Sequence, residues 1–362
     1  LSNGILYLLS SGNDTVSGTD KDDIMIGGNG GDTLYGEDGN DRIFVGNRSK
    51  DKLGDDGTDL SSNTAVGGGG HDTIYGSKGN DTLYGDFDST IDNLTDIILS
   101  KSGNDIIYGG EGNDTIVTDG GNDFVYAGSG NDTITALYGT NTIFTHTDEH
   151  KGNDLDDEEI ENTVTLGDNN NFVYGGKGKD RVVGGSGDNT INLGDGKNKV
   201  YLGNGHNSVK TGKNDDFIVL GDASGVLGNT IYAGKGKDIV RSGSGNDTIN
   251  AGDDDDADEL YGGDGYDVYS VDNNDIISDS DGSGVVWFGH ANHHLKGGVE
   301  TAPNSKIYQA NDYTYYLNGN ELKVVDERTK KSIIIKDYHR ERNDLGIKLI
   351  NKVEVEISDA QA

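Results

Sequence analysis

Aspartate recurs at the sixth position of a nine-residue unit that fits the template G-G-x-G-x-D-x-U-x, where U is a large apolar residue. The frame is plainest from Gly27 to Tyr35 (GGNGGDTLY) and from Gly36 to Phe44 (GEDGNDRIF). Such loops offer carboxylate and carbonyl oxygens, the hard ligands that suit Ca²⁺. The pattern therefore predicts calcium-binding residues at Asp14, Asp23, Asp32, Asp41, Asp72, Asp81, Asp105, Asp114, Asp123, Asp132, Asp180, Asp216, Asp238, Asp247, Asp258 and Asp267.

No soft-metal ligand set competes with calcium. The chain has no Cys, and none of its His residues lies at a sixth position. His290, His293 and His294 cluster after the repeats, but tetrahedral ligand spacing is missing around them, so a solvated polar loop is favoured over a zinc site. The alternative that the Asp residues serve only as turn formers stays open at this point.

The residues around each Asp predict the elements that position it. The eighth position of the unit is apolar throughout, as at Leu34, Ile74 and Val200. Glycine tolerates the positive φ of tight corners, which favours a six-residue loop. The x-U-x stretch that follows predicts a three-residue strand with one inward side chain. Two units would complete one turn, so we expect a parallel β-roll, a solenoid in which each turn contacts its neighbours.

Composition and charge agree with a loop-rich solenoid. The 362 residues include 59 Gly and one Pro, and 64 acidic residues against 29 basic ones give a formal charge of −35. Self-repulsion of this size opposes a compact state, so the loops need a source of positive charge. A nucleic-acid partner is excluded for so acidic a chain. No apolar run approaches the length of a transmembrane segment.

Seven further units keep the frame but carry Asn at the sixth position. They are Asn141, Asn162, Asn171, Asn189, Asn198, Asn207 and Asn229. A neutral amide contributes oxygen without charge, so we expect weak calcium binding or none between about residues 136 and 232. Asn side chains can instead bond to neighbouring loops, which would make this stretch a calcium-independent middle of the roll.

The frame breaks near residues 45–66, 85–99, 145–161, 221–228 and 251–257. A solenoid accommodates such insertions as loops. The stretches 148–161 and 253–256 are strongly acidic. Such charge runs are usually solvated, and an additional cation site is the alternative.

Aromatic residues recur at the ninth position, where the side chain should point outward. They are Tyr35, Phe44, Tyr75, Tyr84, Tyr108, Tyr126, Phe144, Tyr174, Tyr201, Tyr232 and Tyr261. Tyr108, Tyr126 and Phe144 are eighteen residues apart and should form a column on one face. Packing between neighbouring strands is the favoured role, and a platform for sugar rings or a partner protein is the alternative.

From about residue 9 to 270 the repeats resemble those of the RTX (repeats-in-toxin) proteins of Gram-negative bacteria. The resemblance implies an all-β, right-handed parallel β-roll with calcium held between successive turns by sixth-position Asp side chains and loop carbonyls. It implies the pairs Asp14 with Asp32, Asp23 with Asp41, Asp105 with Asp123, and Asp114 with Asp132. Asp238 and Asp247 precede an insertion, so their pairing with Asp258 and Asp267 is less direct. It also implies folding on extracellular calcium and export by the type I secretion machinery.

The composition changes after Asp267, and residues 271–362 resemble the β-rich segment that caps the roll in RTX proteins. Alternating residues at 285–288, 313–317 and 333–335 predict strands there. We therefore expect a roll over residues 1–270 and a cap over residues 271–362. The acidic stretch from Asp279 to Gly282 lacks the ligand spacing of an EF-hand.

The sequence has no catalytic constellation, because G-x-S-x-G, H-E-x-x-H and Cys are all missing. The N-terminus has neither an initiator Met nor a basic segment, so we expect a fragment of a larger protein. The final residues 353–362 leave open whether a secretion signal is present. We expect a non-enzymatic calcium-binding module of a secreted or cell-surface protein. The alternatives are an accessory module of a secreted lipase, protease or alginate epimerase, and an adhesin module that binds a host-surface or bacterial glycan or protein through the Tyr column.

Overall fold

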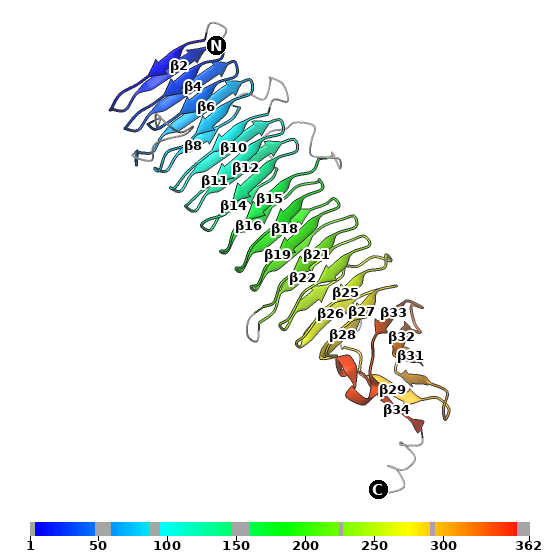
Figure 1. Ribbon diagram of the computed structural model, residues 1–362. Helices are drawn as coiled ribbons and strands as arrows, with labels where there is room; N and C mark the ends of the chain where they lie inside the picture. Colours follow the sequence, from blue (N-terminus) through cyan, green and yellow to red (C-terminus); the bar gives the residue numbers. More distant parts are fainter. Residues whose placement is uncertain are drawn as a thin grey trace. The chain divides into compact units, whose positions relative to one another are not determined.

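The protein consists mainly of short parallel strands joined by glycine-rich loops (Figure 1). The computed structural model describes residues 4–47, 59–86, 95–146, 160–223, 227–289 and 294–352. The chain divides into two compact units, residues 1–194 and 195–362. The expected all-β parallel solenoid is confirmed, with about 14 turns and an antiparallel C-terminal segment.

The strands of the first unit alternate between two parallel sheets. One sheet contains β1 (Leu6–Leu8), β3 (Ile24–Ile26), β5 (Arg42–Phe44), β7 (Thr73–Tyr75), β9 (Ile97–Leu99), β11 (Thr115–Thr118), β13 (Thr133–Ala136), β15 (Thr163–Leu166) and β17 (Arg181–Val183). The other contains β2 (Thr15–Thr19), β4 (Thr33–Asp38), β6 (Thr64–Gly69), β8 (Thr82–Tyr84), β10 (Ile106–Glu111), β12 (Phe124–Ser129), β14 (Thr142–Phe144), β16 (Phe172–Tyr174) and β18 (Thr190–Gly194). Where no insertion intervenes, a residue lies opposite the residue eighteen further on, as Ile107 lies opposite Val125.

The second unit repeats this arrangement and adds an antiparallel segment. Its first sheet contains β19 (Lys199–Leu202), β21 (Phe217–Leu220), β23 (Ile239–Arg241), β25 (Glu259–Tyr261) and β27 (Ile276–Ser278). Its second sheet contains β20 (Ser208–Thr211), β22 (Thr230–Tyr232), β24 (Thr248–Asn250), β26 (Asp267–Val271) and β28 (Gly284–Phe288). The parallel pairing therefore continues past residue 270, through β27 and β28.

The C-terminal segment folds back onto the second unit's own sheet. Its elements are β29 (Gly297–Glu300), β30 (Ile307–Ala310), β31 (Tyr313–Asn318), β32 (Glu321–Asp326), β33 (Ser332–Lys336), the 3₁₀ helices η2 (Arg340–Arg342) and η3 (Asp344–Gly346), and β34 (Lys348–Ile350). Strands β29 to β33 pair in antiparallel order. Strand β33 lies parallel to β27 and so joins the segment to the roll. Among the described residues, no helix is long and apolar enough to cross a membrane.

The core of each roll is one side chain thick. Eighth-position residues such as Leu34, Ile107 and Val200 have no exposed surface, and Val16, in the first turn, is partly buried. Burying each of them stabilises the fold by about 1.5–3 kcal/mol. The prediction of one inward apolar residue for each unit is confirmed. The C-terminal segment adds a denser cluster around Tyr308, Tyr315 and Tyr338, which are at most 2 % exposed.

Glycine is required where loops stack backbone against backbone. Gly128 has a φ of 110°, and a Cβ on it would overlap the carbonyl oxygen of Gly110 one turn earlier. Any larger residue would therefore combine backbone strain with a steric clash. The stacked loops thus depend on the glycines of the repeat.

The aromatic column predicted for one face is confirmed and is longer than expected. Tyr84, Tyr108, Tyr126, Phe144 and Tyr174 stack in sequence, with centroid separations of 4.7, 4.9, 4.9 and 5.1 Å and interplanar angles of at most 16°. Each interior ring therefore faces another ring on both sides. Stacking of this kind contributes stability beyond buried area, and it turns ring edges rather than ring faces outward along the column.

Candidate metal-binding loops

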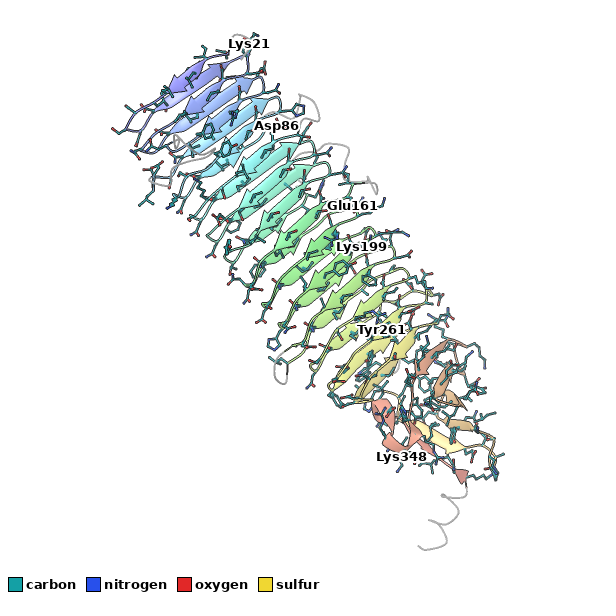
Figure 2. All side chains as sticks on the ribbon, in the orientation of Figure 1. Lys21, Asp86, Glu161, Lys199, Tyr261 and Lys348 are labelled. Atoms are coloured by element: carbon teal, nitrogen blue, oxygen red, sulfur yellow. The ribbon has the colours of Figure 1, made fainter. Side chains whose placement is uncertain are left out.

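Each predicted Asp lies at or just before the start of a strand, in the loop that leads into it. Fifteen of the sixteen are at most 3 % exposed, and Asp14, in the first turn, is partly exposed. The exposed side chains, such as those of Lys21 and Lys199, are drawn with the others in Figure 2. The sixth-position carboxylates are thus buried inside the loops of a highly charged molecule.

A ladder of hydrogen bonds joins the sixth positions of successive turns. At most of these positions the backbone N–H donates to Oδ1 of the sixth-position residue of the next turn. In the pairs implied by the resemblance, the distances are 2.9 Å for Asp14 to Asp32, 2.7 Å for Asp23 to Asp41, 2.9 Å for Asp105 to Asp123 and 2.9 Å for Asp114 to Asp132. Across the insertion, Asp238 donates to Asp258 at 2.7 Å and Asp247 to Asp267 at 2.8 Å. Every one of these pairs is therefore brought together.

The second oxygen, Oδ2, is buried in most of these loops without a hydrogen-bond partner among the described residues. This holds for Asp32, Asp41, Asp72, Asp114, Asp132, Asp238 and Asp267. A buried carboxylate oxygen with no donor carries a free-energy cost. Compensation by a cation would remove that cost.

A backbone carbonyl oxygen approaches the same place in several loops whose first residue is Gly. A Cβ on Gly109, at the first position, would lie 2.6 Å from Asp114 Oδ2 and would also meet the carbonyl oxygen of Ala127. Gly27 stands in the same relation to Asp32 and to the carbonyl oxygen of Val45. The absent side chain leaves a cradle in which a carboxylate and a carbonyl oxygen converge. Calcium prefers this donor set, so the residues present fit the ion.

Burial raises the pKa values of these carboxyls in the metal-free loops. Removal from water is the largest cause, and it raises the pKa of Asp114 to about 7, of Asp72 to about 8 and of Asp258 to about 9. The ladder bond opposes the rise in each case, because a donated hydrogen bond favours the charged form. At neutral pH the ionised carboxyls are therefore in an environment that disfavours their charge.

Three ladder residues, Asn63, Asp96 and Asp275, lie outside the repeats that the nine-residue frame predicts. Asp32 donates to Asn63 Oδ1 at 2.8 Å, and Asp72 donates to Asp96 Oδ1 at 2.8 Å. Asp258 donates to Asp275 Oδ1 at 3.1 Å. Two of the three could have been found by counting, because Asn63 precedes Asp81 by eighteen residues and Asp96 precedes Asp114 by eighteen.

Two of the predicted Asp residues have their second oxygen already bonded. Asp23 Oδ2 accepts from the N–H of Thr19 at 2.7 Å, and Asp81 Oδ2 accepts from the N–H of Ser77 at 2.6 Å. The hydroxyl groups of Thr19 and Ser77 add bonds of 2.9 and 3.0 Å. A hydroxyl residue at the second position of the repeat therefore supplies local donors to these two loops.

Most of the Asn residues enter the same ladder with their amide nitrogens turned into their own loops, whereas Asn162 Nδ2 donates to Asp180 Oδ1 at 3.1 Å and Asn229 Nδ2 to the carbonyl oxygen of Ser242 at 2.8 Å. Asn171 Oδ1 accepts from the N–H of Asn141 at 3.0 Å, and Asn171 Nδ2 donates to the carbonyl oxygen of Asn169 at 3.1 Å. Asn189, Asn198 and Asn207 make the same backward bond to the carbonyl two residues earlier, at 3.0, 3.0 and 3.3 Å. The ladder that the sequence predicted for these residues is confirmed.

Other candidate sites have less support. Among the described residues, no three His, Asp or Glu side chains converge as a metal-binding cluster, in keeping with loops that offer one carboxylate each. His294 packs edge-on against Trp287 at 5.9 Å, whereas His290 and His293 lie outside the described residues. Asp279 accepts hydrogen bonds from Tyr269 Oη and the N–H of Gly282, both at 2.7 Å. The bonds at Asp279 tie the last turns of the second roll together.

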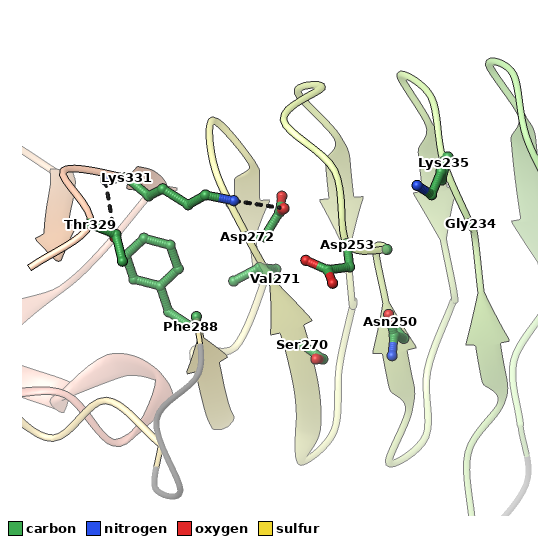
Figure 3. A pocket seen from close by; sticks show the side chains of 12 residues that line it. Gly234, Lys235, Asn250, Asp253, Ser270, Val271, Asp272, Phe288, Thr329 and Lys331 are labelled. Atoms are coloured by element: carbon green, nitrogen blue, oxygen red, sulfur yellow. Dashed lines mark hydrogen bonds and ion pairs between the residues drawn. The ribbon is translucent and has the colours of Figure 1, made fainter.

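A cavity of about 450 Å³ in the second unit lies next to the acidic insertion at 253–256 (Figure 3). Lys331 reaches across from the loop after β32, and its Nζ lies 3.5 Å from Asp272 Oδ2 and 3.0 Å from Asp255 Oδ1. Asn274 Nδ2 also donates to the carbonyl oxygen of Asp255 at 3.0 Å. A lysine ammonium therefore supplies positive charge at this insertion. The acidic stretch at 148–161 falls largely outside the described residues.

Comparison with known proteins bears directly on these loops. The family model described as the RTX calcium-binding nonapeptide repeat (4 copies) matches residues 10–43, 54–91, 92–125, 99–134, 117–147, 161–191, 174–209, 224–257 and 232–269. A search of curated proteins found no match. The family match identifies the repeat module only, and no catalytic domain was identified. Such repeats bind Ca²⁺ and typify secreted bacterial proteins. Since the matched segments cover more than half of the chain, this protein belongs to the family of RTX calcium-binding nonapeptide-repeat proteins.

Proposed function

We propose that this calcium-binding β-roll is a folding switch and secretion module of a larger type I-secreted bacterial protein, unfolded at cytosolic calcium and folded outside the cell. One observation carries the proposal: buried sixth-position carboxylates present an oxygen that has no donor, next to a backbone carbonyl oxygen. A formal charge of −35 adds long-range repulsion to this local cost. The metal-free rolls therefore lack a counter-charge at the places where their turns stack.

Hydrogen bonds between successive turns hold the sixth-position carboxylates in position for a cation. The Oδ1 atoms are fixed by the ladder, as at Asp114, which accepts from the N–H of Asp96 at 2.8 Å. That bond orients Oδ2 toward the cradle at the first position of the loop. When bound there, Ca²⁺ would supply the positive charge that the carboxylate and carbonyl oxygens need. Because the cradle is assembled only when turns stack, binding free energy adds to folding free energy.

Calcium concentration then sets the state of the chain. Extracellular calcium modules have Kd values of about 10⁻⁴–10⁻³ M. Such loops would be empty at the micromolar or lower calcium of a cytosol, which keeps the chain extended enough for export through the type I machinery. Neighbouring turns share the ladder, so filling should be cooperative.

A calcium titration tests this proposal. Far-UV circular dichroism reports the rolls, and fluorescence of Trp287 in β28 reports the end of the second roll. We expect a cooperative gain of β-structure at submillimolar to millimolar Ca²⁺ that Mg²⁺ does not reproduce. A chain that is fully folded in chelator would exclude the switch.

Two other functions stay predictions. An accessory role in a secreted lipase, protease or alginate epimerase requires a catalytic domain elsewhere in the parent protein. An adhesin role requires a glycan or protein that recognises the outward Tyr column, whose interior ring faces are occupied by neighbouring rings. Glycan-array binding that is lost on Tyr108→Ala with Tyr126→Ala would favour the adhesin role, and an array without signal would exclude glycan recognition.

A further inference from the structure

The loops divide into two chemical types according to the second atom of the sixth-position side chain. In Asp loops such as those of Asp114 and Asp132, Oδ2 is buried without a donor among the described residues. In Asn loops the corresponding atom is a nitrogen that already has an acceptor, since Asn171 Nδ2 bonds to Asn169 O at 3.1 Å and Asn189 Nδ2 to Gly187 O at 3.0 Å. These Asp loops therefore need an external partner, whereas these Asn loops are closed by their own backbone.

Two hydrogen bonds fix the orientation of the amide. Asn171 Oδ1 accepts the ladder bond from Asn141 N at 3.0 Å while Nδ2 donates into its own loop. Exchanging oxygen and nitrogen would set N–H against N–H and oxygen against oxygen, with the loss of both bonds. The loop therefore meets the positive end of an amide dipole, and a cation there would face the N–H group.

The charge of the surrounding sequence changes over the same stretch. Residues 175–241 contain ten Lys or Arg against seven Asp or Glu, whereas residues 1–146 contain seven against 24. In the second unit, Lys197 Nζ lies 2.9 Å from Asp215 Oδ2 and Lys213 Nζ lies 2.7 Å from Asp195 Oδ2, each pair joining successive turns. Exposed pairs of this kind contribute little individually. The basic residues of this stretch together offset its negative charge, whereas the negative charge of residues 1–146 stays in excess.

We propose that the sixth-position residue decides which loops take calcium. Asp loops take the ion, whereas Asn loops take none and keep their turns folded without metal, because the amide and the loop lysines replace the ion. This inference rests on the proposed calcium switch and deepens it. The protein then contains a metal-independent stretch within a calcium-dependent fold, and the number of bound ions is smaller than the number of repeats.

Hydrogen exchange of the full chain, read by mass spectrometry, tests the division. In chelator, we expect peptides from residues 163–174 and 190–202, whose strands follow Asn at the sixth position, to exchange roughly 100-fold more slowly than peptides from residues 106–136, because only the former stay folded. In millimolar calcium both sets should be protected. Equally fast exchange of both sets in chelator, with protection of both in calcium, would refute the division and leave the calcium switch intact. Equal protection of both sets in chelator would refute the switch itself and the division with it.

A pair of variants isolates the sixth position. Asn171→Asp places an oxygen against the carbonyl oxygen of Asn169, so the turn should lose its protection in chelator and recover it in calcium. Asn170→Asp adds the same charge one residue earlier, at the exposed fifth position, and keeps the oxygen that accepts from Asp188 N at 2.7 Å. We expect Asn170→Asp to exchange as slowly in chelator as the parent protein does. Equal exchange of the two variants in chelator would contradict the role assigned to the amide. Asn189→Asp repeats the test at a second loop and stays decisive if Asn171→Asp does not fold.

Discussion

Replacing Asp114 by Asn should stabilise the metal-free protein, which is an unusual outcome for a change at a ligand position. The Asn keeps the oxygen that accepts the ladder bond from Asp96 N at 2.8 Å. It replaces the unbonded Oδ2 with an amide group that can close the loop, as at Asn189. Burial raises the pKa of Asp114 from 3.8 to about 7. At about 1.36 kcal/mol for each pKa unit, ionised Asp114 costs the folded metal-free chain about 4 kcal/mol. Water that reaches the loop lowers this figure, so we expect a gain of about 2–4 kcal/mol.

The assay is urea unfolding of the full chain in chelator at pH 7.5, followed by circular dichroism. Asp119→Asn is the matched control, because it removes the same charge from an exposed position of the next loop. Asp114→Asn should raise the free energy of unfolding well above that of Asp119→Asn in chelator. In saturating calcium the order should reverse, with fewer ions bound. If the two variants have equal stability in chelator, or if Asp114→Asn is the less stable, the reasoning about the unbonded oxygen is wrong.

Three further predictions concern pH, the aromatic column and the acidic insertion. Burial raises the pKa of Asp72 to about 8 and that of Asp96 to about 9, so the metal-free fold binds protons more tightly than the unfolded chain. This contribution to stability is complete below about pH 4 and is lost as the pH rises to about 9. Circular dichroism in chelator should therefore show β-structure falling from pH 4.5 to 8.5. A rise in β-structure over this range would contradict the prediction. Tyr126→Ala removes a ring stacked on both sides and should cost about 1–3 kcal/mol in urea unfolding with calcium present, whereas Tyr126→Phe should be nearly neutral; a loss as large for Phe would point to the hydroxyl instead. Lys331→Ala should lower the unfolding free energy by less than about 1 kcal/mol at low salt, with no difference from the parent protein in 1 M salt. A loss of unfolding free energy that persists in high salt would mean that packing rather than charge holds the insertion.

The architecture could be predicted from the sequence because the nine-residue period of the repeat sets how the turns stack. A unit of nine residues places each sixth-position side chain against the backbone of the turn eighteen residues away, so the ladder through Asp105 and Asp123 follows from counting. Insertions shift the frame ahead of Asn63 and Asp96, so their positions follow only from counting back from the intact repeats at Asp81 and Asp114. The hydrogen bond from the N–H of Thr19 to Asp23 Oδ2 could not be predicted from the sixth position alone, because it depends on the backbone conformation at the second position of the repeat. The contact of Lys331 with the insertion depends on tertiary packing between segments far apart in sequence.

The ladder has a direction, and the direction gives the two ends of a roll different requirements. Each buried N–H donates to a side chain of the following turn, and at the end of the second roll Asp267 N donates instead to the carbonyl oxygen of Ser283 at 3.1 Å. Deleting turns from the C-terminal side would leave a backbone N–H that faces water instead of a side-chain oxygen. Deleting them from the N-terminal side would leave an acceptor that water can reach. A truncated roll therefore ends in backbone donors on its C-terminal side and in side-chain acceptors on its N-terminal side, so a segment that covers the first must offer oxygen and one that covers the second must offer N–H groups.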